Sequence, residues 1–246
     1  MIQRENTYCE HFTVPSYMVD GKLRITPSFL FNIMQEIAVN HVHSVGIGWH
    51  HLHEEQKFWA LSRMDVEILR RPKWNEKLEI TTWGKKHNFL VQPRDFWIEN
   101  DNGEVLVKAT SNWVILDLEG KPQLLSNFES RLKNQHDIHA IEKAASRLAA
   151  ATSEQSPLYT PVVYSDIDMN CHANNGAYVT WVMDNFSHNF HQKHELAGIS
   201  INYLQQTRTD ESYAIIQQEI APNEFLASIY TKESHLEVCR VRTQWI

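Results

Sequence analysis

The stretch Thr26-Pro-Ser-Phe-Leu-Phe-Asn-Ile-Met-Gln-Glu-Ile-Ala-Val-Asn-His41 decides the fold of the first half of this chain. Thr26 is a candidate helix cap, and Pro27 fits the first helical position because no intrahelical N–H bond is needed there. A set of mostly apolar residues then recurs at helical spacing and forms one face: Leu30, Ile33, Met34, Ile37, Ala38 and His41. The pattern predicts a long helix that begins at Pro27 and ends near Gly46.

Four strand-like stretches follow this helix, near residues 58–68, 77–82, 88–99 and 104–117. The last two flank Asp101-Asn102-Gly103, which is a strong signal for a hairpin turn. A long helix followed by several antiparallel strands indicates an α+β fold.

The same order of elements returns in the second half of the chain. An extended segment over 158–164 and a polar turn precede a second predicted helix from about Asn174 to Phe190. Strand-like stretches follow near 198–206, 211–220, 224–231 and 235–245. The chain is therefore predicted to hold two copies of one plan, each with a helix packed across its own sheet. We expect an N-terminal unit over 1–118, a connector with some helix over 119–156, and a C-terminal unit over 157–246.

The composition is that of a globular protein, with 246 residues, 42% of them hydrophobic and 22% charged. No apolar run reaches the roughly 18 residues of a membrane helix. The formal charge of −7, with no long basic block, argues against nucleic-acid binding. No secretory signal stands at the N-terminus, and the three cysteines form no CxxC pair, so we expect a cytoplasmic protein with reduced thiols. Cys9 and Cys239 are expected to pack in the interior.

The densest polar run precedes the second helix and carries Asp168, Asn170 and His172 at alternate positions. In an extended segment alternate side chains point the same way, so we expect these three on one face. His172 can transfer a proton near neutral pH, Asp168 can orient the imidazole or a water or attack a carbonyl itself, and Asn170 can hold the water or the carbonyl. The first N–H groups of the helix are expected to stabilise developing negative charge, and they belong to Asn174, Asn175 and Gly176.

The first copy offers a comparison for this polar run. Aligning Tyr17 with Tyr164 sets residues without such chemistry opposite the three candidates, namely Gly21, Leu23 and Ile25. The alternative interpretation is structural, because Asp, Asn and His also make turns and caps by bonding to local backbone. The alternate spacing and the blank first copy together favour chemistry.

Two further signals are weaker. Cys171 and His172 are adjacent and would point to opposite faces of an extended segment, which disfavours a nucleophile–base pair. Two groups of histidines have neither thiol partners nor an H-E-x-x-H arrangement, so we expect surface or capping roles and no metal site. They are His50, His51 and His53 in the first half and His188, His191 and His194 in the second.

The run Tyr164-Ser-Asp-Ile-Asp-Met-Asn-Cys-His-Ala-Asn-Asn175, followed by Tyr178 and Trp181, resembles the signature of the hotdog-fold acyl-carrier-protein thioesterases, in which D-x-N-x-H precedes the central helix. Met34 to Gly46 resembles that family's first central helix. The strands after it fit the family at Ser62-Arg-Met64, Arg71-Pro-Lys-Trp74, Thr82-Trp83 and Thr110-Ser-Asn-Trp113. The resemblance spans about residues 5–245. It implies an α+β tandem (double) hotdog that hydrolyses fatty acyl thioesters on acyl-carrier protein at its second unit, without metal or organic cofactor.

One departure from the family pattern concerns the strand after the second helix. The plant relatives carry Glu followed by Cys there, whereas this chain has Gln206 and Thr207. We therefore expect Asp168 and His172 to carry the proton chemistry, with Gln206 able to position a water.

The partner implied by the resemblance is acidic, so a local basic patch would have to dock it. The best candidates are Arg70, Arg71, Lys73, Lys85 and Lys86, for which the alternative is a solvated strand end. Two other functions stay open, an acyl-CoA thioesterase and a non-catalytic acyl-binding protein. Hotdog units usually pair their sheets, which the tandem copy could satisfy within one chain, and a homodimer also stays open.

Overall fold

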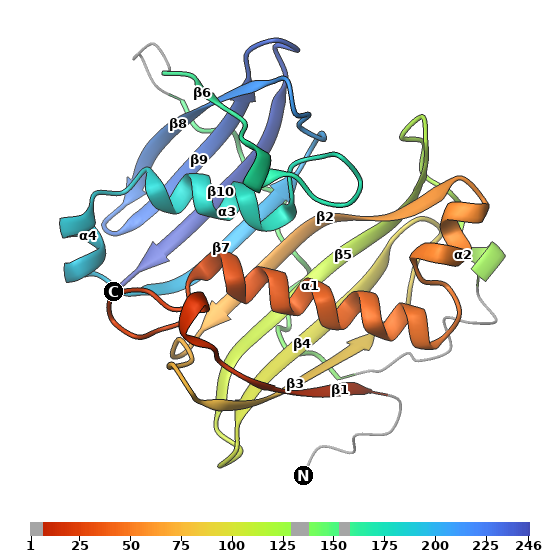
Figure 1. Cartoon of the computed structure of the whole chain (residues 1–246), viewed down its shortest axis with the longest axis horizontal. Helices are drawn as coiled ribbons and strands as arrows, with labels where there is room; N and C mark the ends of the chain where they lie inside the picture. The colour runs from red at the N-terminus through yellow and green to blue at the C-terminus, as the bar shows by residue number, and fades with distance from the viewer. Residues whose placement is uncertain (1–6, 129–137, 153–157) are drawn as a thin grey trace. The chain divides into compact units, whose positions relative to one another are not determined.

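The computed structural model describes residues 7–128, 138–152 and 158–246. The chain divides into two compact units, Met1–Ala145 and Ser146–Ile246. Each unit has a long helix on an antiparallel sheet, as the two-copy reading of the sequence predicts (Figure 1). The division falls inside the predicted connector over 119–156, of which residues 129–137 and 153–156 lie outside the described residues.

The sheet of the first unit has the strand order β1-β3-β4-β5-β2, and all neighbours are antiparallel. Its strands are β1 (Tyr8–Thr13), β2 (Lys57–Ile68), β3 (Lys77–Gly84), β4 (Gln92–Asn100) and β5 (Val105–Asp117). The predicted hairpin joins β4 to β5. Gly103 in its turn has a φ of +76°, a left-handed conformation that glycine adopts without steric cost.

The helix α1 (Pro27–Ser44) lies across this sheet and confirms the prediction from the apolar spacing (Figure 1). Thr26 caps it by accepting a hydrogen bond from the Phe29 N–H at 3.5 Å. The whole predicted face is buried, including His41, which is 5% exposed. A short helix, α2 (Trp49–Glu54), follows it.

The sheet of the second unit has the order β7-β10-β9-β8-β6, again antiparallel throughout. Its strands are β6 (Thr160–Pro161), β7 (Leu196–Tyr203), β8 (Ser212–Ala221), β9 (Glu224–Thr231) and β10 (Glu237–Trp245). The helix α3 (Asn175–Asp184) packs on them through Trp181, which stacks on Tyr213 with ring centroids 3.9 Å apart.

The prediction of one helix from Asn174 to Phe190 is wrong, because α3 stops at Asp184 and α4 (His188–Lys193) starts separately. Ser187 caps α4 by accepting from the Phe190 N–H at 3.1 Å. Phe186, between the helices, is buried against Trp245 and Phe225. Local capping and this aromatic packing outweigh the continuous helical spacing.

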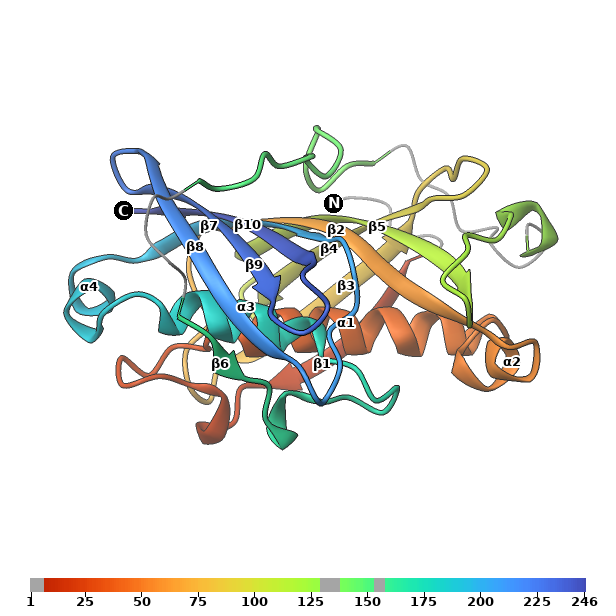
Figure 2. The same ribbon diagram turned by 90° about the horizontal axis from the view of Figure 1, so that it is seen from above.

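The described part of the connector also differs from the expectation of some helix, since residues 138–152 form none. Within the described residues of 119–156, the helical structure consists of one 3₁₀ turn at Leu125–Phe128. Strand side chains accept from the backbone instead, as Asp95 Oδ2 does from the Ala140 N–H at 2.8 Å and Asn202 Oδ1 from the Leu148 N–H at 2.9 Å. In the first unit this segment passes on the side of the sheet away from α1 (Figure 2).

The two cysteines that are expected to pack in the interior differ in their burial. Cys239 is buried as expected, but Cys9 is exposed on β1 and does not pack in the interior. Among the residues that the structure describes, no helix combines the length and the hydropathy that a membrane crossing requires.

Candidate active site

The polar run before α3 forms a tight turn and is not an extended segment. The Asp168 N–H donates to the His172 carbonyl at 2.8 Å, and the Cys171 N–H donates to the Asp168 carbonyl at 3.1 Å. Cys171 takes a left-handed conformation with a φ of +61°. The expectation that alternate side chains share one extended face is therefore wrong, and a reversal of the chain brings Asp168 and His172 together instead.

The carboxylate of Asp168 holds this turn in place. Its Oδ1 accepts from the Asn170 N–H at 2.8 Å and from the His172 N–H at 3.4 Å. Asn170 is exposed, and the other two residues are half-buried. The structural interpretation of the aspartate is thus correct as far as it goes, and any chemical role comes in addition to it.

The first unit builds the same turn around Asp20. Its N–H donates to the Arg24 carbonyl at 2.9 Å, and its Oδ1 accepts from the Lys22 N–H at 2.9 Å and from the Arg24 N–H at 3.2 Å. Leu23 is left-handed with a φ of +57°. The predicted alignment of the two copies is therefore wrong by one residue, and the first copy does have a carboxylate. The equivalent residues are Asp20 and Asp168, Lys22 and Asn170, and Arg24 and His172.

In the first unit the carboxylate is neutralised. Arg71 is 7% exposed, and its Nη1 lies 2.7 Å from Asp20 Oδ2. The same Nη1 donates to the Ile25 carbonyl at 3.2 Å. Asp20 is therefore committed to an internal ion pair and to its turn.

In the second unit Gln206 takes the place of that arginine. The Ala173 N–H donates to the Thr207 carbonyl at 2.9 Å, as the Ile25 N–H donates to the Pro72 carbonyl at 2.8 Å. These matching contacts make the two preceding residues equivalent. Gln206 is exposed and uncharged, so the second turn has no arginine at the position that neutralises the first.

His172 is the titratable group of this turn. Its Nδ1 is buried and has no hydrogen-bond partner among the described residues. Burial lowers the pKa of His172 below 6.5, while the charge of Asp168 acts to raise it and that of Arg208 to lower it further. Burial thus favours the neutral imidazole, and the nearby carboxylate favours the imidazolium once a proton has been taken up.

A buried tyrosine fixes the chain beside this histidine. The Tyr178 hydroxyl donates to Thr207 Oγ1 at 3.0 Å and accepts from the Thr207 N–H at 3.2 Å. The next residue, Arg208, forms an isolated β-bridge with His172. Arg208 is not among the residues that the sequence predicts for this site, although Arg208 and Glu211 have the same spacing as Lys73 and Glu76 in the first unit. The Arg208 N–H donates to Glu211 at 2.9 Å, and the Lys73 N–H to Glu76 at 2.7 Å.

The start of α3 does not supply all the free N–H groups that the sequence predicts. The Asn174 N–H donates to the Asp166 carbonyl at 2.7 Å, and the Gly176 N–H donates to Asn174 Oδ1 at 2.7 Å. The Asn175 carbonyl accepts from the Tyr203 hydroxyl at 2.9 Å. Asn174 is therefore a helix cap, and the predicted role of the Asn174 and Gly176 N–H groups in binding negative charge is wrong.

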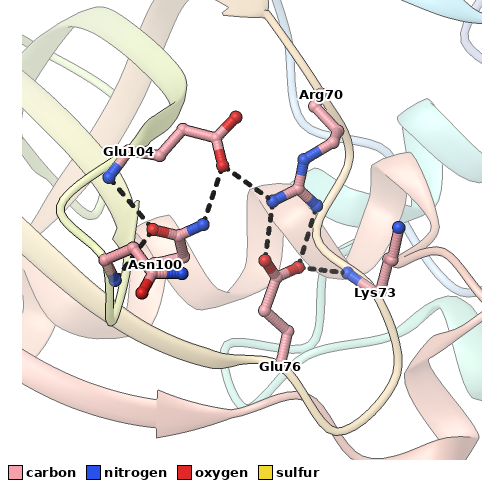
Figure 3. Close-up of polar contacts among 6 residues, drawn as sticks. Arg70, Lys73, Glu76, Asn100 and Glu104 are labelled. Atoms are coloured by element: carbon pink, nitrogen blue, oxygen red, sulfur yellow. Dashed lines mark hydrogen bonds and ion pairs between the residues drawn. The ribbon is translucent and has the colours of Figure 1, made fainter.

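The predicted docking residues begin with Arg70, which belongs to an internal network (Figure 3). Its guanidinium binds both oxygens of Glu76, at 3.0 and 2.7 Å, and reaches Glu104 at 3.3 Å. Asn100 Nδ2 also donates to Glu104, at 2.8 Å. Because two carboxylates surround it, this arginine offers little net positive charge to a partner.

The other four predicted docking residues divide evenly. Arg71 and Lys85 are buried, and Lys85 lies 2.9 Å from Asp95. Lys73 and Lys86 are exposed. Three of the five cations, Arg70, Arg71 and Lys85, are thus ion-paired within the protein. The five residues therefore do not form a continuous basic patch.

The histidine groups behave as capping and surface residues. His191 Nε2 contacts the Met183 carbonyl at 2.8 Å, and His194 Nδ1 contacts the Phe190 carbonyl at 3.0 Å. In α2, His53 stacks on Trp49 with ring centroids 4.4 Å apart.

Comparison with known proteins covers both halves of the chain. Residues 5–124 match the family model described as acyl-ACP thioesterase N-terminal domain, and residues 149–246 match acyl-ACP thioesterase C-terminal domain. The oleoyl-acyl carrier protein thioesterase 2 of Arabidopsis thaliana is 27% identical, over 97% of this chain and 76% of the relative. The palmitoyl-acyl carrier protein thioesterase of Gossypium hirsutum is 24% identical, over 100% of this chain and 65% of the relative.

Solved structures show the same similarity. An acyl-ACP thioesterase from Bacteroides thetaiotaomicron superposes with a TM-score of 0.88 and 26% identity, over 100% of both chains. The 12:0-ACP thioesterase from Umbellularia californica gives a TM-score of 0.87 and 20% identity, over 100% of this chain and 99% of that one. The similarity to the Umbellularia structure supports the tandem hotdog fold. The similarity to the Bacteroides structure supports both the fold and the family.

Proposed function

The chain belongs to the acyl-ACP thioesterase family, and we propose that it hydrolyses fatty acyl thioesters of acyl-carrier protein at the Asp168 turn, releasing free fatty acid. The observation that carries the choice of site is the difference between two otherwise equivalent turns. One turn has an aspartate neutralised by Arg71, with Arg24 at the third position. The other has an uncharged Gln206 and the half-buried His172, whose pKa is lowered by burial.

The proposed reaction needs one proton acceptor and no cofactor. A water oxygen attacks the thioester carbonyl carbon while His172 takes up the water proton, a contribution of about 10²–10⁴ in rate. Asp168 stabilises the resulting imidazolium through its charge. The carbon–sulfur bond then breaks, His172 returns the proton to the departing sulfur, and the acid and the carrier thiol leave. Asn170 is exposed on the same turn, and its proposed role is to hold the carbonyl or the water.

The first unit provides a matched control for this assignment. We expect His172→Gln to lower kcat for hydrolysis of the acyl thioester on acyl-carrier protein by about 10²–10⁴-fold. The equivalent change in the first unit, Arg24→Gln, should leave kcat within about twofold, since that turn has no imidazole and its carboxylate is paired with Arg71. Equal losses in both variants, with both folded by circular dichroism, would show that the second turn has no special role.

Comparison of two carriers tests the substrate. We propose that acyl-carrier protein is the partner, so kcat/KM should be higher for it than for the same acyl group on coenzyme A. A higher value for the coenzyme A thioester would identify an acyl-CoA thioesterase. If acyl groups bind without turnover in either case, the protein is the non-catalytic acyl-binding type.

We also propose a cellular setting for this reaction. Cys9, Cys171 and Cys239 are reduced thiols, as is usual in a reducing compartment, and we propose that the reaction takes place in the cytoplasm. Light scattering on the purified chain distinguishes a monomer from the homodimer that the sequence also allows.

A further inference from the structure

A thiol, an imidazole and a carboxylate meet on the exposed edge of the first unit. Cys9 and His11 lie on β1, and Glu79 lies on the neighbouring strand β3. One ligand atom from each, a sulfur, a ring nitrogen and a carboxylate oxygen, lies within 4.8 Å of the other two. Both β1 residues are exposed, and Glu79 is half-buried.

The strand register creates this cluster. Cys9 and His11 are two residues apart, so their side chains project from the same face of β1. In the antiparallel pairing of β1 with β3, His11 stands directly opposite Glu79, and Cys9 stands opposite Thr81. Residues directly opposite have Cβ atoms about 4.5–5.5 Å apart, which allows both side chains to reach one bound atom.

We propose that Cys9, His11 and Glu79 bind a divalent transition-metal ion of the zinc class, with water as the fourth ligand. Zinc–sulfur and zinc–nitrogen bonds of about 2.3 and 2.0 Å in a tetrahedron place neighbouring ligand atoms about 3.5 Å apart. The three ligand atoms already lie within 4.8 Å of one another, and the two ligands on β1 are exposed, so side-chain rotation would close the remaining distance. Thiolate and imidazole ligands favour zinc, cobalt or copper over magnesium and calcium, which prefer all-oxygen sites.

The charge around the cluster favours a cation. Glu99 on β4 stands opposite Glu79 in the register and on the same face of the sheet. The nearest cation along β3 is Lys77. It is two residues from Glu79 and stands opposite Thr13 in the strand register. Glu79 and Glu99 thus bring two carboxylates to this face, and carboxylates attract a cation. The thiol and the imidazole must be deprotonated to bind the ion, so its affinity should rise with pH.

The opposite face of β1 contacts α1, so an ion here would act on the first unit as a whole. Tyr8 stacks on His41 with ring centroids 5.2 Å apart, and Glu10 Oε1 accepts from Asn40 Nδ2 at 3.0 Å. An ion that ties β1 to β3 would fix the strand that lies against α1. The site uses none of the residues of the proposed reaction, so its occupancy can be measured apart from hydrolysis.

Cobalt titration of the full chain tests the proposal directly. Co²⁺ added to the reduced protein should give a thiolate-to-cobalt charge-transfer absorption and saturate at one ion per chain. Zn²⁺ should displace it. Cys9→Ser should abolish the charge-transfer absorption, and His11→Gln or Glu79→Gln should weaken Co²⁺ binding by at least about tenfold.

Cys171→Ser is the matched control, because Cys171 is also an exposed thiol but lies in the other unit. This variant should keep the wild-type cobalt spectrum and affinity. Zn²⁺ should also raise the thermal unfolding midpoint of the wild type and not that of Cys9→Ser, since an ion bound only to the folded state stabilises it. The proposal is overturned if the wild type gives no thiolate-to-cobalt absorption, or if that absorption survives in Cys9→Ser.

Discussion

Replacing Asp168 by Asn and, separately, Asp20 by Asn compares two residues that make the same turn and differ in their charged neighbours. Each accepts two backbone N–H groups through Oδ1. Asn keeps a carbonyl oxygen at that place, so both turns can still close. The difference between the variants therefore reports what the negative charge does in each unit.

The expected cost follows from the contacts. A hydrogen bond to a charged acceptor contributes about 1.5–3 kcal/mol and a neutral one about 0.5–1.5, so losing the charge costs about 2 kcal/mol over the two bonds of either turn. Asp20→Asn also leaves the buried guanidinium of Arg71 without its carboxylate. Breaking a buried pair costs about 3–5 kcal/mol, and because Asp20 is 30% exposed we expect the lower part of that range or less. Asp20→Asn should therefore destabilise the protein by about 4 kcal/mol and Asp168→Asn by about 2.

Two assays separate stability from catalysis. Urea denaturation gives the free energy of unfolding of each variant. Steady-state hydrolysis of the acyl thioester on acyl-carrier protein, at a temperature where both variants are folded, gives kcat. Asp168→Asn should lower kcat by about 10²-fold or more, because the imidazolium loses its counter-charge. Asp20→Asn should retain the wild-type kcat although it is the less stable variant.

The opposite ranking would refute this reasoning. If Asp168→Asn keeps the wild-type kcat, the carboxylate is a turn residue in both units and has no part in the reaction. If Asp20→Asn is no less stable than Asp168→Asn, the Arg71 pair does not neutralise Asp20 as the distances indicate.

Three other changes have defined outcomes. Tyr178→Phe removes both contacts with Thr207, so it should cost about 1–2 kcal/mol in urea denaturation and lower kcat more than it changes KM. Burial lowers the pKa of His41 to about 3 in the folded protein. As the pH falls below 6.5, the His41 imidazole therefore takes up a proton in the unfolded chain before it does so in the folded one. Stability should then fall by up to about 1.4 kcal/mol per pH unit, a slope that His41→Gln removes from unfolding curves at about pH 4–6. Asp95→Asn should cost about 3–5 kcal/mol by the same measurement, because Lys85 is left buried without its carboxylate.

The elements that the sequence predicts correctly are those with a strong local pattern. Six core-facing positions at helical spacing identify α1, and Asp101-Asn102-Gly103 identifies the β4–β5 hairpin. Both depend on residues that are close in the chain. The strands after each helix are found for the same reason, since alternation of side chains is a local property.

The predictions that failed involve contacts between distant residues. The connector shows helical spacing at Ala145 and Leu148, yet the Leu148 N–H bonds to Asn202, 54 positions away. The basic residues near position 70 look available in sequence, yet Arg71 is bound to Asp20, 51 positions away. The polar run before α3 is a local exception. Its spacing predicts an extended segment, but Asp168 binds the backbone of Asn170 and His172 and turns the chain.

By itself, the sequence determined the two-copy α+β plan, the family resemblance and the three candidate residues of the second turn, because periodicity and motif order are written along the chain. The tertiary structure alone decided which turn is neutralised, by placing Arg71 on one aspartate and an uncharged glutamine at the equivalent place near the other. It also decided that His172 is half-buried, which lowers its pKa, and that Cys9 and His11 meet Glu79. Strand register and burial bring together side chains tens of residues apart, and no local pattern encodes those distances.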